Sequence, residues 1–195
     1  MSTPHYRLPI ELCERVIDDL ESDRHTLGAC ALVCSNWTQR SRFQLFSTTH
    51  VSESNARQFL ELLASSSSVR SYITHLTIDI PSASHLLKIA AHPAFGRLSS
   101  VQTLHIRNID WTSLPLANQL ALERYLAQLQ NTSTLVLDGV TFHDLAALLR
   151  AASAFSRVAR VRLVGVEFSK YLQSNLALAR ASARRVPGEL AGSGG

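Results

Sequence analysis

Four short segments with alternating apolar residues recur between residues 75 and 163 and constrain the fold of the chain. They are His75-Leu76-Thr77-Ile78, Thr103-Leu104-His105-Ile106, Thr134-Leu135-Val136-Leu137 and Arg160-Val161-Arg162-Leu163. Their second residues lie 28, 31 and 26 positions apart. Strict alternation over so short a stretch indicates a β-strand with one buried face. The spacing therefore predicts a stack of similar units, each with one strand.

Three of these segments continue in the same way, as Arg107-Asn108-Ile109, Asp138-Gly139-Val140 and Val164-Gly165-Val166. The pattern apolar-x-apolar-x-[Asn or Gly]-apolar is similar to the leucine-rich repeat. The resemblance implies that alternate side chains point into a solenoid, while Asn or Gly allows the chain to turn out of each strand. The spacing is looser than the 20 to 29 residues of a regular array.

The stretches between the predicted strands have helical periodicity. Apolar residues at helical spacing fall within 82–91, 116–129 and 142–152. Parallel strands joined by helices predict a curved α/β solenoid, with strands on one face and helices on the other. The rival interpretation is an ordinary α/β layer fold. No phosphate loop or dinucleotide-binding glycine cluster follows any strand, so the rival predicts no chemistry of its own.

Residues 8–46 carry more apolar surface than a short helical segment can bury. Three helices are indicated, with apolar positions at 8, 12, 16, 17 and 20, then 27 and 31–33, then 37 and part of 41–46. One face of each helix can close a small core. Pro9, Ile10, Leu20 and Trp37 then remain as candidates for an interface with another protein.

Two blocks of this segment, Leu8-Pro9-Ile10-Glu11-Leu12 and Val33-Cys34-Ser35-Asn36-Trp37, resemble the F-box. Phe46, where many members have Trp, and the pair Ser35-Asn36 depart from the family pattern. The resemblance implies docking on the Skp adaptor, and through it on a cullin scaffold and a ubiquitin-conjugating enzyme. The adaptor-binding residues that it implies are Leu8, Pro9, Ile10, Leu12, Ile17, Leu27, Val33 and Trp37. The alternative is that these residues only close an internal core.

The predicted fold class is α+β, with a three-helix F-box-like module followed by a short, irregular α/β leucine-rich-repeat-like solenoid. We expect the module at 1–50, a linker helix and Ser-rich loop at 51–70, the repeat units at 71–176 and a disordered tail at 177–195. The linker helix is expected within 52–64, and the serines at 65–68 are expected to form the loop.

Composition limits the location and the chemistry of the protein. The longest apolar run, residues 29–34, is far shorter than the roughly 20 residues that cross a bilayer, so no membrane partner is expected. The opening residues do not resemble a secretory signal, which leaves the cytoplasm or the nucleus. The odd number of cysteines, Cys13, Cys30 and Cys34, argues against a disulfide framework, and we expect them reduced and buried.

No catalytic, metal or cofactor site is predicted. Cys30 and Cys34 are four residues apart, but the eight histidines are scattered singly. His75 and His105 are expected on the outer face of the strands, exposed to solvent. Motifs of hydrolases, metalloproteases, P-loop proteins and kinases are absent from the sequence. The nearest proton-transfer cluster, residues 138, 143 and 144, lacks a nucleophile.

Charge is distributed unevenly. Residues 150–185 contain eight Lys or Arg and one acid, Glu167, whereas 1–149 contain 11 bases and 13 acids. Arg160 and Arg162 are expected to point outward from the last strand, where a solenoid would bind a substrate. The basic stretch itself is typical of a solvated helix face and tail.

These observations support one main hypothesis and two alternatives. The first is a non-enzymatic substrate-recognition subunit of a Skp-cullin-F-box ubiquitin ligase, which binds the adaptor through its N-terminal helices and a protein target through the repeats. The alternatives are a non-catalytic repeat scaffold with no ubiquitin link, and a basic nucleic-acid-binding protein that uses residues 150–185.

Overall fold

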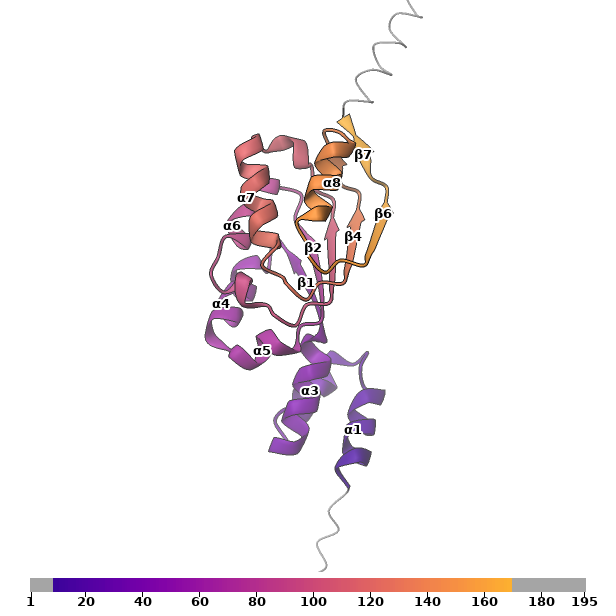
Figure 1. Cartoon of the computed structure of the whole chain (residues 1–195). Coiled ribbons are helices and arrows are strands. Elements are labelled where there is room, and N and C mark those ends of the chain that lie inside the picture. The colour runs from indigo at the N-terminus through magenta and orange to yellow at the C-terminus, as the bar shows by residue number, and fades with distance from the viewer. Residues whose placement is uncertain (1–8, 170–195) are drawn as a thin grey trace, which may run out of the picture.

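A computed structural model describes residues 9–169 of the chain and shows a parallel sheet with helices on one side and a small helical unit at one end (Figure 1). The helical unit comes first in the sequence. It consists of α1 (Ile10–Asp19), α2 (Arg24–Cys30) and α3 (Ser35–Ser47). The three predicted N-terminal helices are thus present.

Five parallel strands form the main sheet and follow one another in the order of the sequence. They are β1 (Thr48–Ser52), β2 (His75–Asp79), β3 (Thr103–Arg107), β4 (Thr134–Asp138) and β6 (Arg160–Val164). The short strands β5 (Thr141–Phe142) and β7 (Glu167–Phe168) pair in parallel beside it. The structure confirms all four strands expected from the repeat. It adds β1 as a fifth, which the sequence analysis missed.

The register of the sheet brings equivalent residues of successive units side by side. One inward row runs from Val51 through Ile78, Ile106 and Leu137 to Leu163. The first four of these side chains are at most 2% exposed. Alternate residues of the same strands form an outward face that no described helix covers. The alternation that predicted the strands is therefore the division between the core and this outward face.

Helices connect the strands and cover the inward face. They are α4 (Ala56–Ser65), α5 (Ser67–Tyr72), α6 (Ala83–Ala90), α7 (Leu116–Leu126) and α8 (Leu145–Ser153), with short 3-10 turns η1 (Phe95–Arg97) and η2 (Trp111–Ser113). The core lies between these helices and the sheet. Phe95, Trp111 and Phe142 are its largest buried side chains, and the last two rings lie 5.4 Å apart.

The chain leaves β3, β4 and β6 through equivalent turns. Asn108, Gly139 and Gly165 have φ angles of 54°, 64° and 56°, a region that L side chains other than Asn and Asp rarely adopt. This explains the Asn or Gly at the fifth position of the repeated pattern.

The expected loop at 65–68 is wrong in its second half. Ser67 and Ser68 begin α5, and the hydroxyl of Ser66 accepts a hydrogen bond from the backbone N–H of Val69. A serine that caps a helix in this way satisfies one of its unpaired N–H groups. The expected module boundary at residue 50 falls inside β1, which pairs with β2 along its whole length. The predicted tail at 177–195 lies outside the described residues.

Candidate functional site

The N-terminal helices enclose a small core of their own. Ile17 of α1 and Leu27 of α2 are fully buried, and Cys13 and Cys30 are nearly so. Asp23 caps α2 by accepting a hydrogen bond from the backbone N–H of Thr26 at 3.0 Å. Two apolar side chains from α1 and two from α2 therefore form this core.

A charged contact joins α1 to α3. Both Nε and Nη2 of Arg40 donate to the Asp18 carboxylate at 2.6 Å, and the side-chain amide of Gln44 donates to it at 2.5 Å. The hydrogen bonds from Arg40 hold the pKa of Asp18 below its usual value. Arg40 also lies over the ring of Phe43, which meets Tyr72 of α5 edge-on. The Asp18–Arg40 pair therefore joins α1 to α3, and the Phe43–Tyr72 contact joins α3 to α5.

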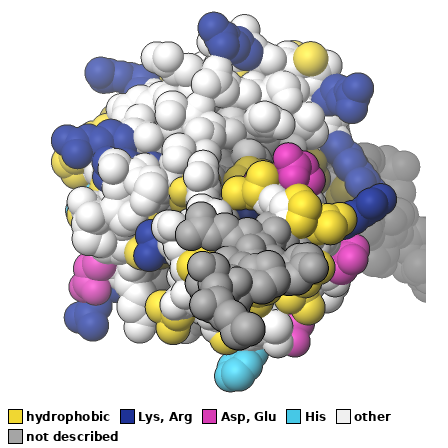
Figure 2. Space-filling model, turned by 90° about the horizontal axis from the view of Figure 1, so that it is seen from below, with side chains coloured by type: hydrophobic (Ala, Val, Ile, Leu, Met, Phe, Trp, Pro, Cys, Tyr) yellow, Lys and Arg dark blue, Asp and Glu magenta, His cyan; other side chains and the backbone are white. Residues whose placement is uncertain are grey.

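Apolar side chains remain exposed on the same helices. The exposed fractions are 45% for Ile10, 47% for Leu12, 45% for Val16, 86% for Leu32 and 64% for Val33. Figure 2 views this end of the molecule, where hydrophobic side chains gather beside the atoms drawn in grey. We call these five residues, together with the exposed Pro9, the apolar end surface. Several exposed large apolar residues on one small helical unit are typical of a protein interaction site.

The structure separates the residues implied by the F-box resemblance into two groups. Pro9, Ile10, Leu12 and Val33 belong to the apolar end surface, and Trp37 is half-buried at the start of α3. Ile17 and Leu27 face the internal core, so their side chains maintain the helices and are not available for contact. Leu8 lies outside the described residues.

Two exposed residues of this surface were missed as site residues. Val16 lies four residues after Leu12 on α1, so both side chains emerge on one helix face. Leu32 is in the turn between α2 and α3. The spacing of Leu12 and Val16 was the available signal.

One expectation about the cysteines is wrong. Cys34 is exposed, because it precedes α3 in extended conformation, outside the core that holds Cys13 and Cys30. Within residues 9–169, no group of three or more metal-binding side chains comes together.

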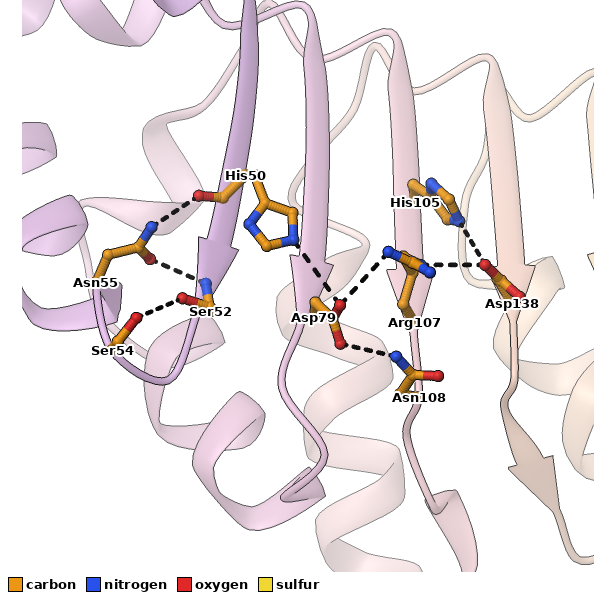
Figure 3. A network of polar contacts seen from close by, with 9 residues as sticks. All are labelled: His50, Ser52, Ser54, Asn55, Asp79, His105, Arg107, Asn108 and Asp138. Carbon is orange, nitrogen blue, oxygen red and sulfur yellow. Dashed lines mark hydrogen bonds and ion pairs between the residues drawn. The ribbon is translucent and has the colours of Figure 1, made fainter.

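The outward face of the sheet carries a network of charged and polar side chains (Figure 3). Arg107 of β3 lies between two carboxylates, with its Nε 3.1 Å from Asp138 and its Nη1 3.5 Å from Asp79. The side-chain amide of Asn108 donates to Asp79 at 2.9 Å. His50 lies 3.9 Å from Asp79, on the side opposite Arg107. The network therefore crosses four strands and links successive units.

His105 is less exposed than expected. Its side chain is 30% exposed, and its Nε2 lies 3.6 Å from Asp138. Desolvation lowers the pKa of His105, and the nearby carboxylate of Asp138 opposes this shift in part. His75 is exposed, as expected.

The basic stretch is not one continuous surface in the described part of the chain. Arg150 donates through Nε to Glu123 of α7 at 3.1 Å, and Arg157 donates to Asn131. Arg160 and Arg162 are exposed on the last strand, β6. The bases at 170, 180, 184 and 185 lie outside the described residues.

The proton-transfer groups near residue 140 are separately engaged. Asp138 belongs to the network of the outward face. Asp144 caps α8 by accepting from the backbone N–H of Ala147 at 2.9 Å, and His143 lies 3.3 Å from the hydroxyl of Ser169. Their arrangement does not direct the three groups at a common point.

No protein-family model matches the sequence, and no curated protein matches it. Among the described helices, none has the length and hydrophobicity to cross a membrane.

Proposed function

We propose that this protein is a non-enzymatic substrate receptor of a Skp-cullin-F-box ubiquitin ligase. In this proposal α1 to α3 are an F-box-like module that docks on the Skp adaptor, and the strand-helix units are a short leucine-rich-repeat-like solenoid that holds a protein target. A receptor of this kind acts in the cytoplasm or the nucleus. It raises the local concentration of substrate lysines near a conjugating enzyme and needs no catalytic group of its own.

One observation carries the proposal. The three helices close their core with Ile17 and Leu27 and still expose the apolar end surface. Side chains that the helices do not need for their own core are available for a partner, and large apolar residues at the centre of an interface commonly dominate its binding energy. The positions exposed here include Pro9, Leu12 and Val33, which belong to the two blocks that resemble the F-box.

The connection between the two parts supports a receptor role. α3 ends at Ser47 and β1 begins at Thr48, so no residue intervenes between the helical unit and the sheet. The backbone carbonyl of Ser47 also accepts a hydrogen bond from the N–H of Thr74, just before β2. A target held by the sheet would thus stand at a fixed position relative to the adaptor.

Binding to a purified Skp adaptor tests the proposal. The wild-type chain should form a complex that survives size-exclusion chromatography. The double variant L12E/V33E should weaken binding by at least about 30-fold. A charge in place of a buried apolar anchor makes the binding free energy less favourable by roughly 2 kcal/mol or more. Both residues are exposed, so the variant should keep the circular dichroism of the wild type.

The matched control places the same charges on another exposed apolar pair. Leu116 and Leu120 of α7 are 60% and 41% exposed and lie among the strand-helix units. The variant L116E/L120E should bind the adaptor as the wild type does. A wild-type chain that does not bind the adaptor, or an L12E/V33E variant that binds it equally well, would contradict the proposal.

A scaffold without a ubiquitin link is the second candidate, and the contact between Phe43 and Tyr72 favours it. That contact makes α3 part of the packing at the first end of the sheet, as expected for a helical cap. The scaffold predicts no adaptor binding by the wild-type chain, so the same experiment distinguishes the two candidates.

A further inference from the structure

The last strand of the sheet, β6, has a neighbour on one side only. It pairs with β4, and no described strand of the main sheet lies beyond it. The backbone N–H of Arg160 donates to the carbonyl of Ser133, and the N–H of Gly139 donates to the carbonyl of Val164. Residues 160 and 164 therefore face β4. Because alternate residues of a strand pair on opposite sides, the N–H and C=O groups of Val161 and Leu163 point away from the sheet and have no partner among residues 9–169.

The inward side chains of β6 are exposed as well. Val161 and Leu163 are 46% and 48% exposed, whereas Leu135 and Leu137, their direct neighbours on β4, are 1% and 2% exposed. The four residues occupy the same two inward rows. The apolar rows of the core thus continue to the edge of the sheet and end there uncovered.

The outward side of the same edge is basic. Arg160 and Arg162 lie opposite Thr134 and Val136 of β4, neither of which carries a charge. The nearest acid in the outward rows, Asp138, is engaged with Arg107. Within the described residues neither arginine forms an ion pair, so this edge presents two positive charges.

The opposite edge of the sheet is closed. The side chain of Asn55 accepts a hydrogen bond from the N–H of Ser52 and donates one to the carbonyl of His50, both at 2.9 Å. Both backbone groups belong to β1, the first strand, and point away from its neighbour β2. A side chain that occupies edge groups in this way opposes the addition of another strand. Such a closure is absent from β6 within the described chain.

We propose that the free edge of β6 binds an extended segment of a partner protein in which acidic and apolar residues alternate. The segment adds to the sheet as a further strand. Its backbone pairs with Val161 and Leu163, its acidic side chains lie beside Arg160 and Arg162, and its apolar side chains extend the inward rows. Strand addition obtains affinity from the backbone and specificity from alternate side chains. As a statement of substrate class, this inference rests on the proposed receptor function.

Fluorescence anisotropy with two labelled peptides tests the inference on the full chain. One peptide has the sequence Glu-Val-Glu-Val-Glu-Val-Glu, and the other has Lys in place of each Glu. The wild-type chain should bind the Glu peptide at least about tenfold more tightly than the Lys peptide. In R160E/R162E this preference should reverse, because the charges at the edge reverse while the backbone groups remain.

A second variant removes a backbone donor of the edge together with the side chain of Leu163. Leu163→Pro removes the N–H that points away from β4 and breaks no hydrogen bond to β4. Proline is tolerated at the solvent side of an edge strand. It should weaken binding of the Glu peptide at least about tenfold. The matched control is R124E, which reverses an exposed charge on α7 and should bind both peptides as the wild type does. Circular dichroism shows which variants are folded. If L163P does not fold, R160E/R162E alone serves as the test.

Hydrogen exchange and sedimentation distinguish the other occupants of this edge. In the free chain the amide protons of Val161 and Leu163 should exchange rapidly, and the Glu peptide should slow them. Slow exchange in a free monomer would mean that residues 170–195 occupy the edge, and slow exchange in a dimer would mean that a second copy does. Either result would overturn the inference, as would equal binding of both peptides or undiminished binding to L163P.

The adaptor experiment keeps this inference separate from the proposed function. R160E/R162E and L163P leave α1 to α3 unchanged, so both variants should bind the Skp adaptor as the wild type does. If these variants lose peptide binding but still form the adaptor complex, the substitutions affect only the edge of β6. Failure of the wild-type chain to bind the adaptor overturns the receptor function, whatever the peptides do.

Discussion

Arg40 binds the carboxylate of Asp18 with two of its nitrogen atoms, and this pair fixes α1 against α3. Both hydrogen bonds measure 2.6 Å. The pair is more than a third exposed on the Asp18 side, at 38%, so solvent screens part of its energy. Its structural importance comes from its position, since it joins α1 to α3 beside the core that Cys13 and Ile17 form.

The Asp18–Arg40 pair gives a pH-dependent stability. The pKa of Asp18 is lower in the folded state than in the unfolded chain. The pair therefore stabilises the fold above the unfolded value of about 4, and this contribution is lost as the pH falls through the lower folded value. Asp18→Asn should cost about 0.5–1 kcal/mol at pH 7 and progressively less below pH 4. Urea unfolding of both proteins between pH 7 and pH 2 measures the difference, and a constant difference would contradict the prediction.

Truncation of the buried residues should affect adaptor binding by a different route from L12E/V33E. Ile17→Ala or Leu27→Ala leaves a cavity in the core of the N-terminal helices and should cost about 2–4 kcal/mol. Hydrogen exchange should increase in α1 to α3 before the sheet is affected. Addition of the Skp adaptor should restore protection in these variants, whereas it should have no such effect on L12E/V33E.

Two glycine substitutions should have opposite effects. Gly139 has a φ of 64°, and an added Cβ would lie 2.9 Å from the side-chain oxygen of Asn108. Gly139→Ala should therefore destabilise the protein by about 1–2 kcal/mol. Gly28 lies within α2, and apart from its chain neighbours and the backbone of its own helix no heavy atom lies within 4 Å of an added Cβ. Gly28→Ala should stabilise it by about 0.5–1 kcal/mol, measured as a rise in Tm, because alanine has the higher helix propensity.

His105 should titrate below the usual range of histidine. Desolvation lowers its pKa, and the carboxylate of Asp138 raises it in part. Asp138→Asn should therefore lower the pKa of His105 further. NMR titration of the imidazole signals measures both values. Since the unfolded chain binds this proton at a higher pH than the folded chain does, the stability should decrease as the pH falls from about 6.5 through the folded pKa. His105→Gln should reduce that slope, and an unchanged slope would refute the assignment.

The buried carboxylate of Glu123 forms an ion pair with Arg150. Glu123 is 5% exposed, and Arg150 reaches it from α8. Arg150→Ala should cost about 1–3 kcal/mol, because it leaves a buried carboxylate without its cation. Arg124→Ala, on the exposed side of α7 beside Glu123, should change the free energy of unfolding by less than about 0.5 kcal/mol. A smaller loss in the double variant E123Q/R150A would show that the interaction is specific to the pair.

The sequence predicted the repeated strands because their local signals agree. Inward residues such as Leu104 and Leu135 alternate with polar ones, and Asn or Gly stands where the backbone needs a positive φ. β1 was missed because Val51 is its one fully buried residue and its neighbours are polar. Its conformation depends on pairing with β2, a contact between residues more than 20 positions apart. α5 was missed because serine favours both loops and helix caps.

The candidate site could be predicted only in part. The F-box resemblance identified Leu12 and Val33, which are exposed, but it grouped them with Ile17 and Leu27, which are buried. Short helices with apolar residues on two faces do not reveal which face turns inward until they pack. The network around Arg107 was not foreseen, since Asp79 and Asp138 are 59 positions apart in the sequence and meet on Arg107 through the register of the sheet.

The direct passage from α3 into β1 leaves no slack between the two parts of the molecule. A single residue inserted after Ser47 would shift Val51 out of its inward row or rotate the helical unit by about 100°. In the proposed receptor, the lysines that become modified would then be selected by rigid geometry and not by diffusion on a tether. Such an insertion should change which lysines are modified while both partners still bind.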